Sequence, residues 1–170
     1  MTGETRWLTD EEQRAWRAFL VATQRLDQAI DRDLQQNAGM PHAYYMILAM
    51  LSEAPARSLT ITDLAAVLNS SVSRLSHALR RLEALGWIRK DADPDDKRVS
   101  WAVLTEDGMR VLVDAAPGHV RTVATHVFDR LTPEQVEQLQ EISRAILGGL
   151  APGASVENLL RPDLVAERKR

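Results

Sequence analysis

The chain has 170 residues, a formal net charge of −3 and no cysteine, which excludes disulfides, thiolate metal sites and cysteine-based redox sensing. Hydrophobic residues make up 45% and charged residues 26%, the composition of one globular domain with a buried core. No apolar run approaches the roughly 18–20 residues of a membrane span, and the N-terminus has no secretory signal. We therefore expect a cytoplasmic protein with no membrane partner.

Two helices are predicted at the N-terminal end. Thr9 and Glu12 can form a capping box, in which each side chain accepts the backbone N–H of the other residue. Apolar residues then recur every three or four positions, which predicts one face of a long helix ending at Gly39. This face consists of Trp16, Phe19, Leu20, Thr23, Leu26, Ile30 and Leu34. Pro41 opens a second, mostly buried helix, and residues 54–58 are expected to form a loop.

A helix, a short polar turn and another helix follow. The stretch ITDLAAVLN predicts a short helix capped by Thr62, NSS is the turn, and apolar residues from Val72 to Gly86 mark one face of the next helix. Small and basic side chains on the opposite face suit a helix that enters the major groove of DNA. These are Ser70, Ser73, Arg74, His77 and Arg81.

The local charge supports the same interpretation. Residues 70–90 hold five basic residues and one glutamate, which gives +4 inside an acidic chain. What matters for DNA binding is where charge lies and not its total. The alternative is an ordinary solvated helix face.

The periodicity changes after Gly86. Residues 99–104 alternate after the turn-rich stretch DADPDDKR, which predicts a β-hairpin, and a hairpin directly after a recognition helix is a wing. Thr105 caps a long helix in which Pro117-Gly118 predicts a kink or a break. Thr132 caps a last helix that ends near residue 149.

Two of these stretches resemble the MarR family (multiple antibiotic resistance regulators). SVSRLSHALRRLEALGWIRK matches the family's recognition helix and first wing strand. DPDDKRVSWAVLTEDG matches its wing signature of Asp-x-Arg, several apolar residues and Leu-Thr-x-x-Gly. The second match is the more specific, because it fixes a turn, a strand and a helix cap at set spacing. The resemblance spans roughly residues 8–147.

The resemblance implies a mainly α fold with a small β-hairpin wing, a winged helix-turn-helix with dimerisation helices at both ends. The expected units are an N-terminal dimerisation helix in 1–36, the DNA-binding lobe in 37–105, C-terminal dimerisation helices in 106–149 and a tail in 150–170. A homodimer would read a pseudo-palindromic operator in double-stranded DNA, with half-sites roughly 34 Å apart. We expect a repressor and not an activator.

The expected DNA contacts divide between the two grooves. Those in the major groove are Arg74, His77 and Arg81, with Ser70 and Ser73 alongside, and Arg80 and Lys97 would bind phosphates. By the resemblance, Arg98 at the wing tip enters the minor groove, and Asp96 holds the arginine or the turn in shape. Asp93-Pro94-Asp95 supplies turn chemistry, so these acidic residues would organise the loop and face away from phosphate.

Many relatives in the family are switched by small, often aromatic acids bound between the dimer helices and the DNA-binding lobe. The candidates in this chain are Trp16, Arg17, His42, Tyr45 and Met46, an aromatic wall with Arg or His for a carboxylate. The alternative is that Trp16, Tyr45 and Met46 are core residues and that His42 only helps to start a helix.

No enzyme, metal site or cofactor is expected. His119 and His126 are seven residues apart on one helix face, but no HExxH or His-rich cluster accompanies them, so they are expected to be surface or interface histidines. The sequence has no Gly-rich phosphate loop, no nucleophile elbow and no paired-carboxylate site of known spacing.

Two other functions remain open. One is a winged-helix protein-interaction module that has lost DNA binding, which should show an apolar recognition face in place of Arg74, Arg81 and Arg98. The other is an architectural DNA binder without effector and with little specificity. The salt dependence and the specificity ratio of binding would separate this second alternative from a regulator.

Overall fold

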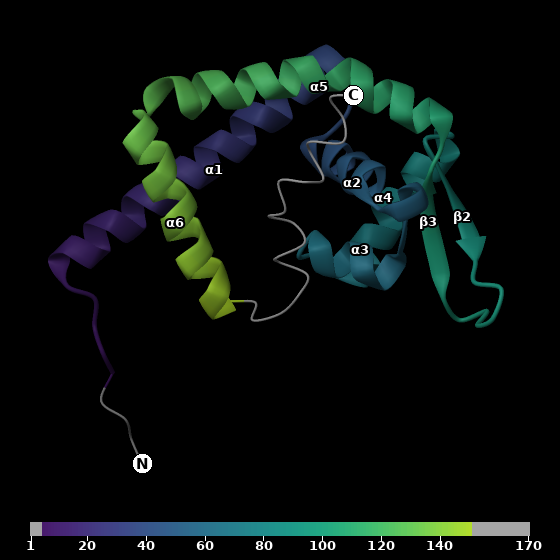
Figure 1. Cartoon of the computed structure of the whole chain (residues 1–170), viewed down its shortest axis with the longest axis horizontal. Coiled ribbons are helices and arrows are strands. Elements are labelled where there is room, and N and C mark those ends of the chain that lie inside the picture. The colour runs from purple at the N-terminus through teal and green to yellow at the C-terminus, as the bar shows by residue number, and fades with distance from the viewer. Residues whose placement is uncertain (1–4, 151–170) are drawn as a thin grey trace.

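A computed structural model describes residues 5–150, so the tail expected from residue 150 onward lies outside them apart from Leu150. The fold class is as predicted, mainly helical with a small antiparallel sheet (Figure 1). Within the described part, every helix is too short or too polar to span a lipid bilayer. The elements in chain order are α1 (Asp10–Ala38), α2 (His42–Glu53), η1 (Pro55–Arg57), β1 (Ser58–Thr60), α3 (Ile61–Val67), α4 (Val72–Ala84), β2 (Ile88–Ala92), β3 (Ser100–Leu104), α5 (Glu106–His126), η2 (Phe128–Arg130) and α6 (Pro133–Leu150).

Helix termini follow the local signals in the sequence. The capping box at Thr9 and Glu12 is present, and Gly39 ends α1 in the left-handed conformation with φ 65°. The side chain of Thr105 caps α5, and Thr132 exchanges hydrogen bonds with Gln135 at the start of α6. The cap predicted at Thr62 is wrong. Thr60 caps α3 instead, because its hydroxyl accepts the N–H of Asp63 at 3.1 Å.

The hairpin supplies two strands of a three-stranded antiparallel sheet with the order β1-β3-β2. Strands β2 and β3 form the predicted wing, with Ile88 opposite Leu104 and Ala92 opposite Ser100. The prediction of a loop over residues 54–58 is wrong at its end. Ser58 starts β1 by pairing with Val103, a partner 45 positions away that no local pattern reveals.

The core lies where the first four helices meet the sheet. Leu34 of α1, Leu48 of α2, Leu64 of α3 and Leu79 of α4 are each no more than 1% exposed. Val72, which the periodicity placed on the inward face of α4, is 49% exposed because it is the first residue of the helix and projects past this core. The inward face of α4 is therefore formed by its leucines.

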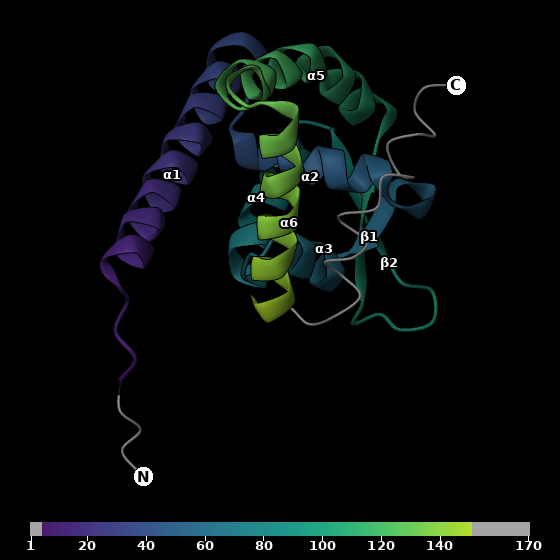
Figure 2. The ribbon, with the colours of Figure 1, turned by 60° about the vertical axis from the view of Figure 1, so that its left-hand side comes forward.

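The outer helices extend beyond this core. Of the apolar face predicted for α1, only Ile30 and Leu34 are buried, and none of the described side chains of α6 is buried. Figures 1 and 2 show the N-terminal half of α1 and the whole of α6 reaching away from α2 and the sheet. A kink or a break was expected at Pro117-Gly118. The break does not occur, and α5 continues through Pro117 as one gently arched helix (Figure 1).

The start of α5 is packed tightly against the start of β2. The Thr105 hydroxyl accepts the N–H of Gly108 at 3.0 Å and donates to the carbonyl of Gly86 at 2.7 Å. A Cβ atom on Gly108 would overlap the carbonyl oxygen of Trp87 and lie 2.8 Å from Leu104 Cδ1. The glycine of the Leu-Thr-x-x-Gly signature therefore allows helix and strand to approach this closely.

Candidate nucleic-acid interface

Helix α4 presents a polar face to solvent. The hydroxyl of Ser71 caps the helix by accepting the N–H of Arg74 at 3.3 Å, and Leu75, Leu79 and Leu82 are buried on the opposite side. The structure brings the predicted DNA-contact residues of this segment together on the outer side. Ser70 is half-buried, and Ser73, Arg74, His77, Arg80 and Arg81 are exposed.

The side chains of Arg80 and His77 contact each other on this face. Its Nη2 lies 2.8 Å from Nδ1 of the histidine ring, one turn back along α4. Because a guanidinium only donates hydrogen bonds, a ring nitrogen in this contact must act as an acceptor and be unprotonated. His77 and Arg80 therefore form one polar unit beside Arg74 and Arg81.

The recognition helix is fixed to the wing by short contacts. Gly86 leaves α4 with φ 75°, a conformation that glycine adopts at little cost, and Trp87 N–H donates to the carbonyl of Leu82 at 2.9 Å. Lys90 of β2 then pairs with Glu83 of α4 at 3.0 Å. The wing and α4 are thus held in one geometry, as a two-groove contact requires.

The acidic loop is organised around the Asp93 carboxylate. Its Oδ1 accepts the backbone N–H of Asp95 at 2.9 Å and that of Asp96 at 3.1 Å, while Oδ2 accepts the indole N–H of Trp101 at 2.9 Å. These hydrogen bonds, the one from the indole first, lower the pKa of Asp93 from its ordinary value. The carboxylate stays ionised and closes the turn.

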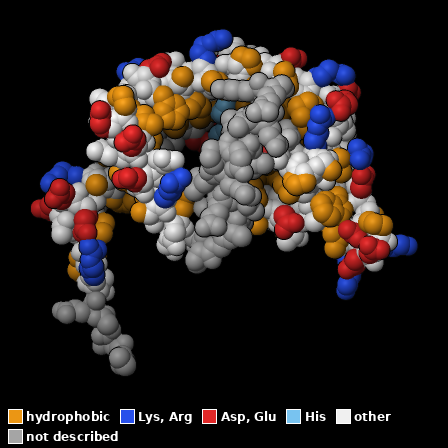
Figure 3. All heavy atoms as spheres, viewed as in Figure 1, with side chains coloured by type: hydrophobic (Ala, Val, Ile, Leu, Met, Phe, Trp, Pro, Cys, Tyr) orange, Lys and Arg blue, Asp and Glu red, His pale blue; other side chains and the backbone are white. Residues whose placement is uncertain are grey.

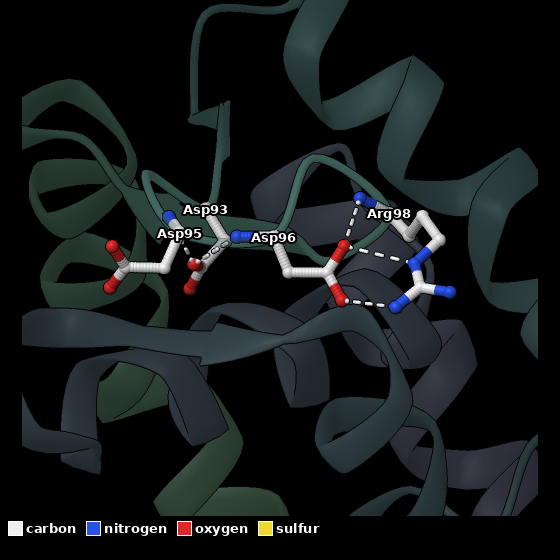
Figure 4. Close-up of polar contacts among 4 residues, drawn as sticks. All are labelled: Asp93, Asp95, Asp96 and Arg98. Atoms are coloured by element: carbon white, nitrogen blue, oxygen red, sulfur yellow. Dashed lines mark hydrogen bonds and ion pairs between the residues drawn. The ribbon is translucent and has the colours of Figure 1, made fainter.

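Asp96 binds Arg98 at the wing tip (Figure 4). Its Oδ1 accepts the backbone N–H and the Nε–H of Arg98, both at 3.0 Å, and its Oδ2 accepts from Nη2 at 2.9 Å. The arginine hydrogen bonds lower the pKa of Asp96, and the carboxylate raises the pKa of Arg98. The Arg98 side chain is nevertheless 91% exposed, so its remaining N–H groups face solvent.

The remaining charges of the wing are mixed in sign. Arg89 Nε pairs with both oxygens of Asp91, at 3.2 and 3.0 Å, and Lys97 is exposed beside Arg98. The carboxylate of Asp95 points away from Arg98 in Figure 4. Figure 3 shows acidic and basic side chains intermixed at the wing tip, at the lower right of the molecule. Three of the hairpin's aspartates thus have N–H donors of the hairpin itself as partners.

A pocket of about 630 Å³ lies between α2 and α5. Of the predicted ligand residues, Tyr45 and Met46 line it, and Tyr45 is also core, at 7% exposure. Trp16, Arg17 and His42 are not among its lining residues. Sequence reasoning missed the rest of the wall, which is Ala49, Met50, Ser52, Glu53, Arg57, Met109, Leu112, Val113, Ala116 and His119.

Two histidines meet beside this pocket. The His119 ring lies with its centroid 4.2 Å from that of Tyr45 and stacks at 5.8 Å on His42, which in turn pairs with Asp27 at 3.0 Å. Burial lowers the pKa of His119, His42 lowers it further, and Asp33 opposes them. His119 Nδ1 is buried and has no hydrogen-bond partner among the described residues. The His119 ring is therefore held in its neutral form. His126, the other histidine of α5, is exposed at the C-terminal end of that helix.

No three His, Cys, Asp or Glu side chains in residues 5–150 gather in a way that could hold a metal ion. Exposed arginines lie instead on α4 and at the wing tip.

Comparison with known proteins agrees with this geometry. The model of the MarR family matches residues 38–99. Sco3205, a MarR family transcriptional regulator from Streptomyces coelicolor solved in complex with DNA, is 50% identical in sequence, and the match covers 89% of this chain and 95% of that chain with a TM-score of 0.85. This chain belongs to the MarR family.

Two further MarR relatives have a lower sequence identity. AbsC, a MarR family transcriptional regulator from Streptomyces coelicolor, is 38% identical in sequence. The match covers 88% of this chain and 100% of that chain, with a TM-score of 0.81. The transcriptional repressor MprA of Escherichia coli (strain K12) is 26% identical over 112 residues, which is 66% of this chain and 63% of that protein. As a MarR-family protein, the chain is a DNA-binding transcriptional regulator and not an enzyme.

Sequence reasoning missed two features of this MarR protein, one in the wing and one at the start of α4. Trp101 was assigned to the strand pattern, without its hydrogen bond to Asp93, because the bond depends on the register between β2 and β3. Ser71, and not only its neighbours Ser70 and Ser73, serves the start of α4. A signal for Ser71 was available, since serine directly before the first apolar residue of a helix is a usual N-cap.

Proposed function

We propose that this protein is a homodimeric, sequence-specific repressor that reads a pseudo-palindromic operator and is released by a small aromatic acid. The proposed division of labour is dimerisation by residues 1–36 and 106–149, DNA binding by residues 37–105, and a tail in 150–170. The observation that carries the proposal is the exposed polar face of α4 beside the exposed Arg98, in a chain 50% identical to a MarR regulator solved with DNA.

The two grooves would be read by different elements. Arg74, His77 and Arg81 of α4 offer donors to base edges or phosphates in the major groove, with Ser70 and Ser73 small enough to permit close approach. Arg80 and Lys97 would bind phosphates. Arg98, fixed by Asp96 and extended from the tip, has the position needed to enter a narrow minor groove.

Dimerisation is supported by apolar side chains that are exposed on the outer helices of the described part of the chain. On α1, Trp16, Phe19 and Leu20 are 49%, 46% and 37% exposed, and on α6 Leu139, Ile142 and Ile146 are 38%, 55% and 42% exposed. Figure 3 shows hydrophobic side chains gathered at the upper left, where α5 turns into α6. Exposed apolar groups on two long helices at both ends of the chain suit a second copy of the same chain.

Release by an effector would use the pocket between α2 and α5. Tyr45 and three methionines, Met46, Met50 and Met109, give it an adaptable apolar wall, and Arg57 is a cation in the same wall. This combination suits a flat apolar ring that carries a carboxylate. The repressor role is supported by the relative MprA, which is a transcriptional repressor.

The first experiment measures fluorescence anisotropy on duplexes tiled across the DNA that flanks this protein's own gene. Wild type is compared with Arg98→Ala at two salt concentrations, and Arg32→Ala is the control, since Arg32 is an exposed arginine of α1, outside α4 and the wing. We expect one tile to bind tightly, with a steep salt dependence. Arg98→Ala should weaken that binding on the order of tenfold or more, and Arg32→Ala should not.

Other outcomes would identify another function. Equal weak binding to every tile and to unrelated DNA would indicate an architectural protein. No binding at low salt would indicate the protein-interaction module. Unchanged affinity in a folded Arg98→Ala protein would overturn the assignment of the wing.

The effector is tested with benzoate and its ring-substituted derivatives against preformed operator complex, with benzamide as the uncharged match. Release by a benzoate and not by its amide is expected, and Arg57→Gln should abolish release while leaving operator affinity unchanged. Equal release of the wild-type and Arg57→Gln complexes would show that the carboxylate binds elsewhere.

A further inference from the structure

Trp101 connects the sheet to the turn that carries the wing arginine. It lies on the central strand β3, opposite Asp91 of β2 on one side and Thr60 of β1 on the other. Asp93 is two residues beyond Asp91, so it is the diagonal neighbour of Trp101 on the same face of the hairpin. A large aromatic side chain can reach such a diagonal neighbour, and the indole N–H meets Asp93 Oδ2 at 2.9 Å.

The two carboxylate oxygens of Asp93 accept hydrogen bonds from different parts of the hairpin. Oδ1 accepts the backbone N–H groups of Asp95 and Asp96 and so defines the turn, while Oδ2 is fixed to the sheet by the indole. Without the indole, the carboxylate could rotate about its side-chain bonds together with the turn that it closes. The indole N–H thus adds a side-chain contact from β3 to a turn whose backbone is bound to Val99, through the Asp93 N–H at 3.1 Å and the Asp96 carbonyl at 2.9 Å.

The chain of contacts continues to the arginine. The Asp96 backbone is bound to Asp93, and the Asp96 carboxylate holds both the N–H and the guanidinium of Arg98. Every link from the indole to the guanidinium is a hydrogen bond with a donor–acceptor distance between 2.9 and 3.1 Å. The half-buried Trp101 is thereby coupled to the exposed Arg98 three positions away.

We propose that Trp101 is a positioning residue for DNA binding: its indole N–H, acting through Asp93 and Asp96, orders the wing tip so that Arg98 is presented to DNA in one orientation. Trp101 itself does not contact DNA. The proposal rests on the proposed minor-groove contact of Arg98. Its effect is preorganisation, because a disordered tip must lose conformational freedom on binding, whereas an ordered tip has already lost it.

The central variant is Trp101→Phe, which keeps an aromatic ring in the sheet and removes the N–H donor together with part of the ring's volume. It leaves the net charge unchanged, so the salt dependence of DNA binding should stay the same. We expect operator affinity to fall by roughly three- to tenfold, the range that the loss of one hydrogen bond gives. Trp87→Phe, the same change of ring at the base of the hairpin, is the matched control and should bind as wild type does.

A second variant, Asp93→Asn, removes the same hydrogen bond without changing the packing of the Trp101 ring. The asparagine oxygen can still accept the two turn N–H groups, but its NH2 group meets the indole donor to donor. Combined with Trp101→Phe, it should add no further loss of affinity, because both changes remove the same hydrogen bond. Nitrogen-15 NMR of the tryptophan side chains should show the indole signal of Trp101, identified by its loss in Trp101→Phe, shifting in Asp93→Asn.

The Arg98→Ala background separates this proposal from the proposed function. If Trp101 acts through Arg98, Trp101→Phe weakens operator binding in the wild type and changes nothing further in Arg98→Ala. An equal loss in both backgrounds, or wild-type affinity in Trp101→Phe, overturns the positioning role while the wing contact stands on the effect of Arg98→Ala alone. Wild-type affinity in Arg98→Ala itself overturns the proposed wing contact and, with it, this inference.

Discussion

Asp96 binds Arg98 through three hydrogen bonds, two to the guanidinium and one to the backbone N–H, between residues only two positions apart. This contact explains how an acidic loop can lie at a surface meant for DNA. Asp91 is paired with Arg89, Asp93 with three N–H donors and Asp96 with Arg98. Most of the loop's negative charge is therefore neutralised or directed inward, and the arginine projects from it.

Replacing Asp96 and replacing Asp95 should have opposite effects on DNA binding. Asp96→Asn removes the ion pair that orients Arg98, so we expect operator affinity to fall several-fold. Asp95→Asn removes the same charge from a side chain that points away from Arg98, so affinity should be unchanged or higher because repulsion from phosphate decreases (Figure 4). Anisotropy titrations at a single salt concentration give the comparison, and a gain in affinity for Asp96→Asn would contradict the orienting role.

The wing carboxylates should not titrate in the neutral range. Because the pKa values of Asp93 and Asp96 are lowered on folding, their contribution to stability is present above their unfolded values and is lost only as the pH falls through the lower folded ones. Carbon-13 NMR of the aspartate carboxyl groups should therefore show both resonances constant from neutral pH down to about pH 5. A transition of either resonance within that range would contradict the hydrogen-bonding pattern of the tip.

Stability should depend on pH through His119. Its folded-state pKa lies below the ordinary 6.5, so between the two values the unfolded chain binds a proton that the folded chain does not. The free energy of unfolding should therefore decrease as the pH falls through this window. His119→Phe keeps a ring against Tyr45 and removes the titration, so its urea unfolding should depend less on pH. The exposed His126→Gln is the control and should keep the wild-type dependence.

A charge on the apolar face of α6 should prevent dimerisation. Ile142 is 55% exposed in the single chain, and Ile142→Glu would bury a carboxylate in the proposed interface. We expect a folded monomer by light scattering, with operator binding lost because only one half-site can be held. Gln140→Glu adds a charge on another side of the same helix and should remain dimeric. A dimeric Ile142→Glu protein would show that α6 lies outside the interface.

Gly108 should tolerate no side chain. In Gly108→Ala, the new methyl group would meet the backbone oxygen of Trp87, so either α5 or the start of β2 must move, at a cost of about 1–3 kcal/mol in the free energy of unfolding. Gly118→Ala lies on the same helix, where its Cβ would be at an ordinary 3.6 Å from Asp33 Oδ2. It should be neutral or stabilising by up to about 1 kcal/mol. Urea unfolding of the two variants tests the difference in sign.

The sequence predicted what depends on neighbouring residues. Thr9, Gly39 and Thr105 cap helices through contacts within a few positions, and the leucines of α4 follow the helical period. Strand β1 was missed because Ser58 and Val103 are partners only after the chain has folded. The pocket wall was incomplete for the same reason, since Arg57 and Met109 belong to separate elements. The cap was predicted at Thr62, but Thr60 has the same side chain two positions earlier, and only backbone geometry shows that Thr60 is the cap.

The continuity of α5 has a consequence for the spacing of a dimer's two DNA-binding lobes. Thr105 alone separates β3 from α5, and the helix then runs 21 residues without a break, a length of about 31 Å. A rigid rod of this length that rotates by about 5° at one end moves its other end by about 3 Å. The pocket is lined by α5 residues from Met109 to His119, so a bound molecule would lie along this rod. In the proposed homodimer, a tilt of α5 by about 5° would therefore shift the wing at its end by about 3 Å relative to the partner's wing.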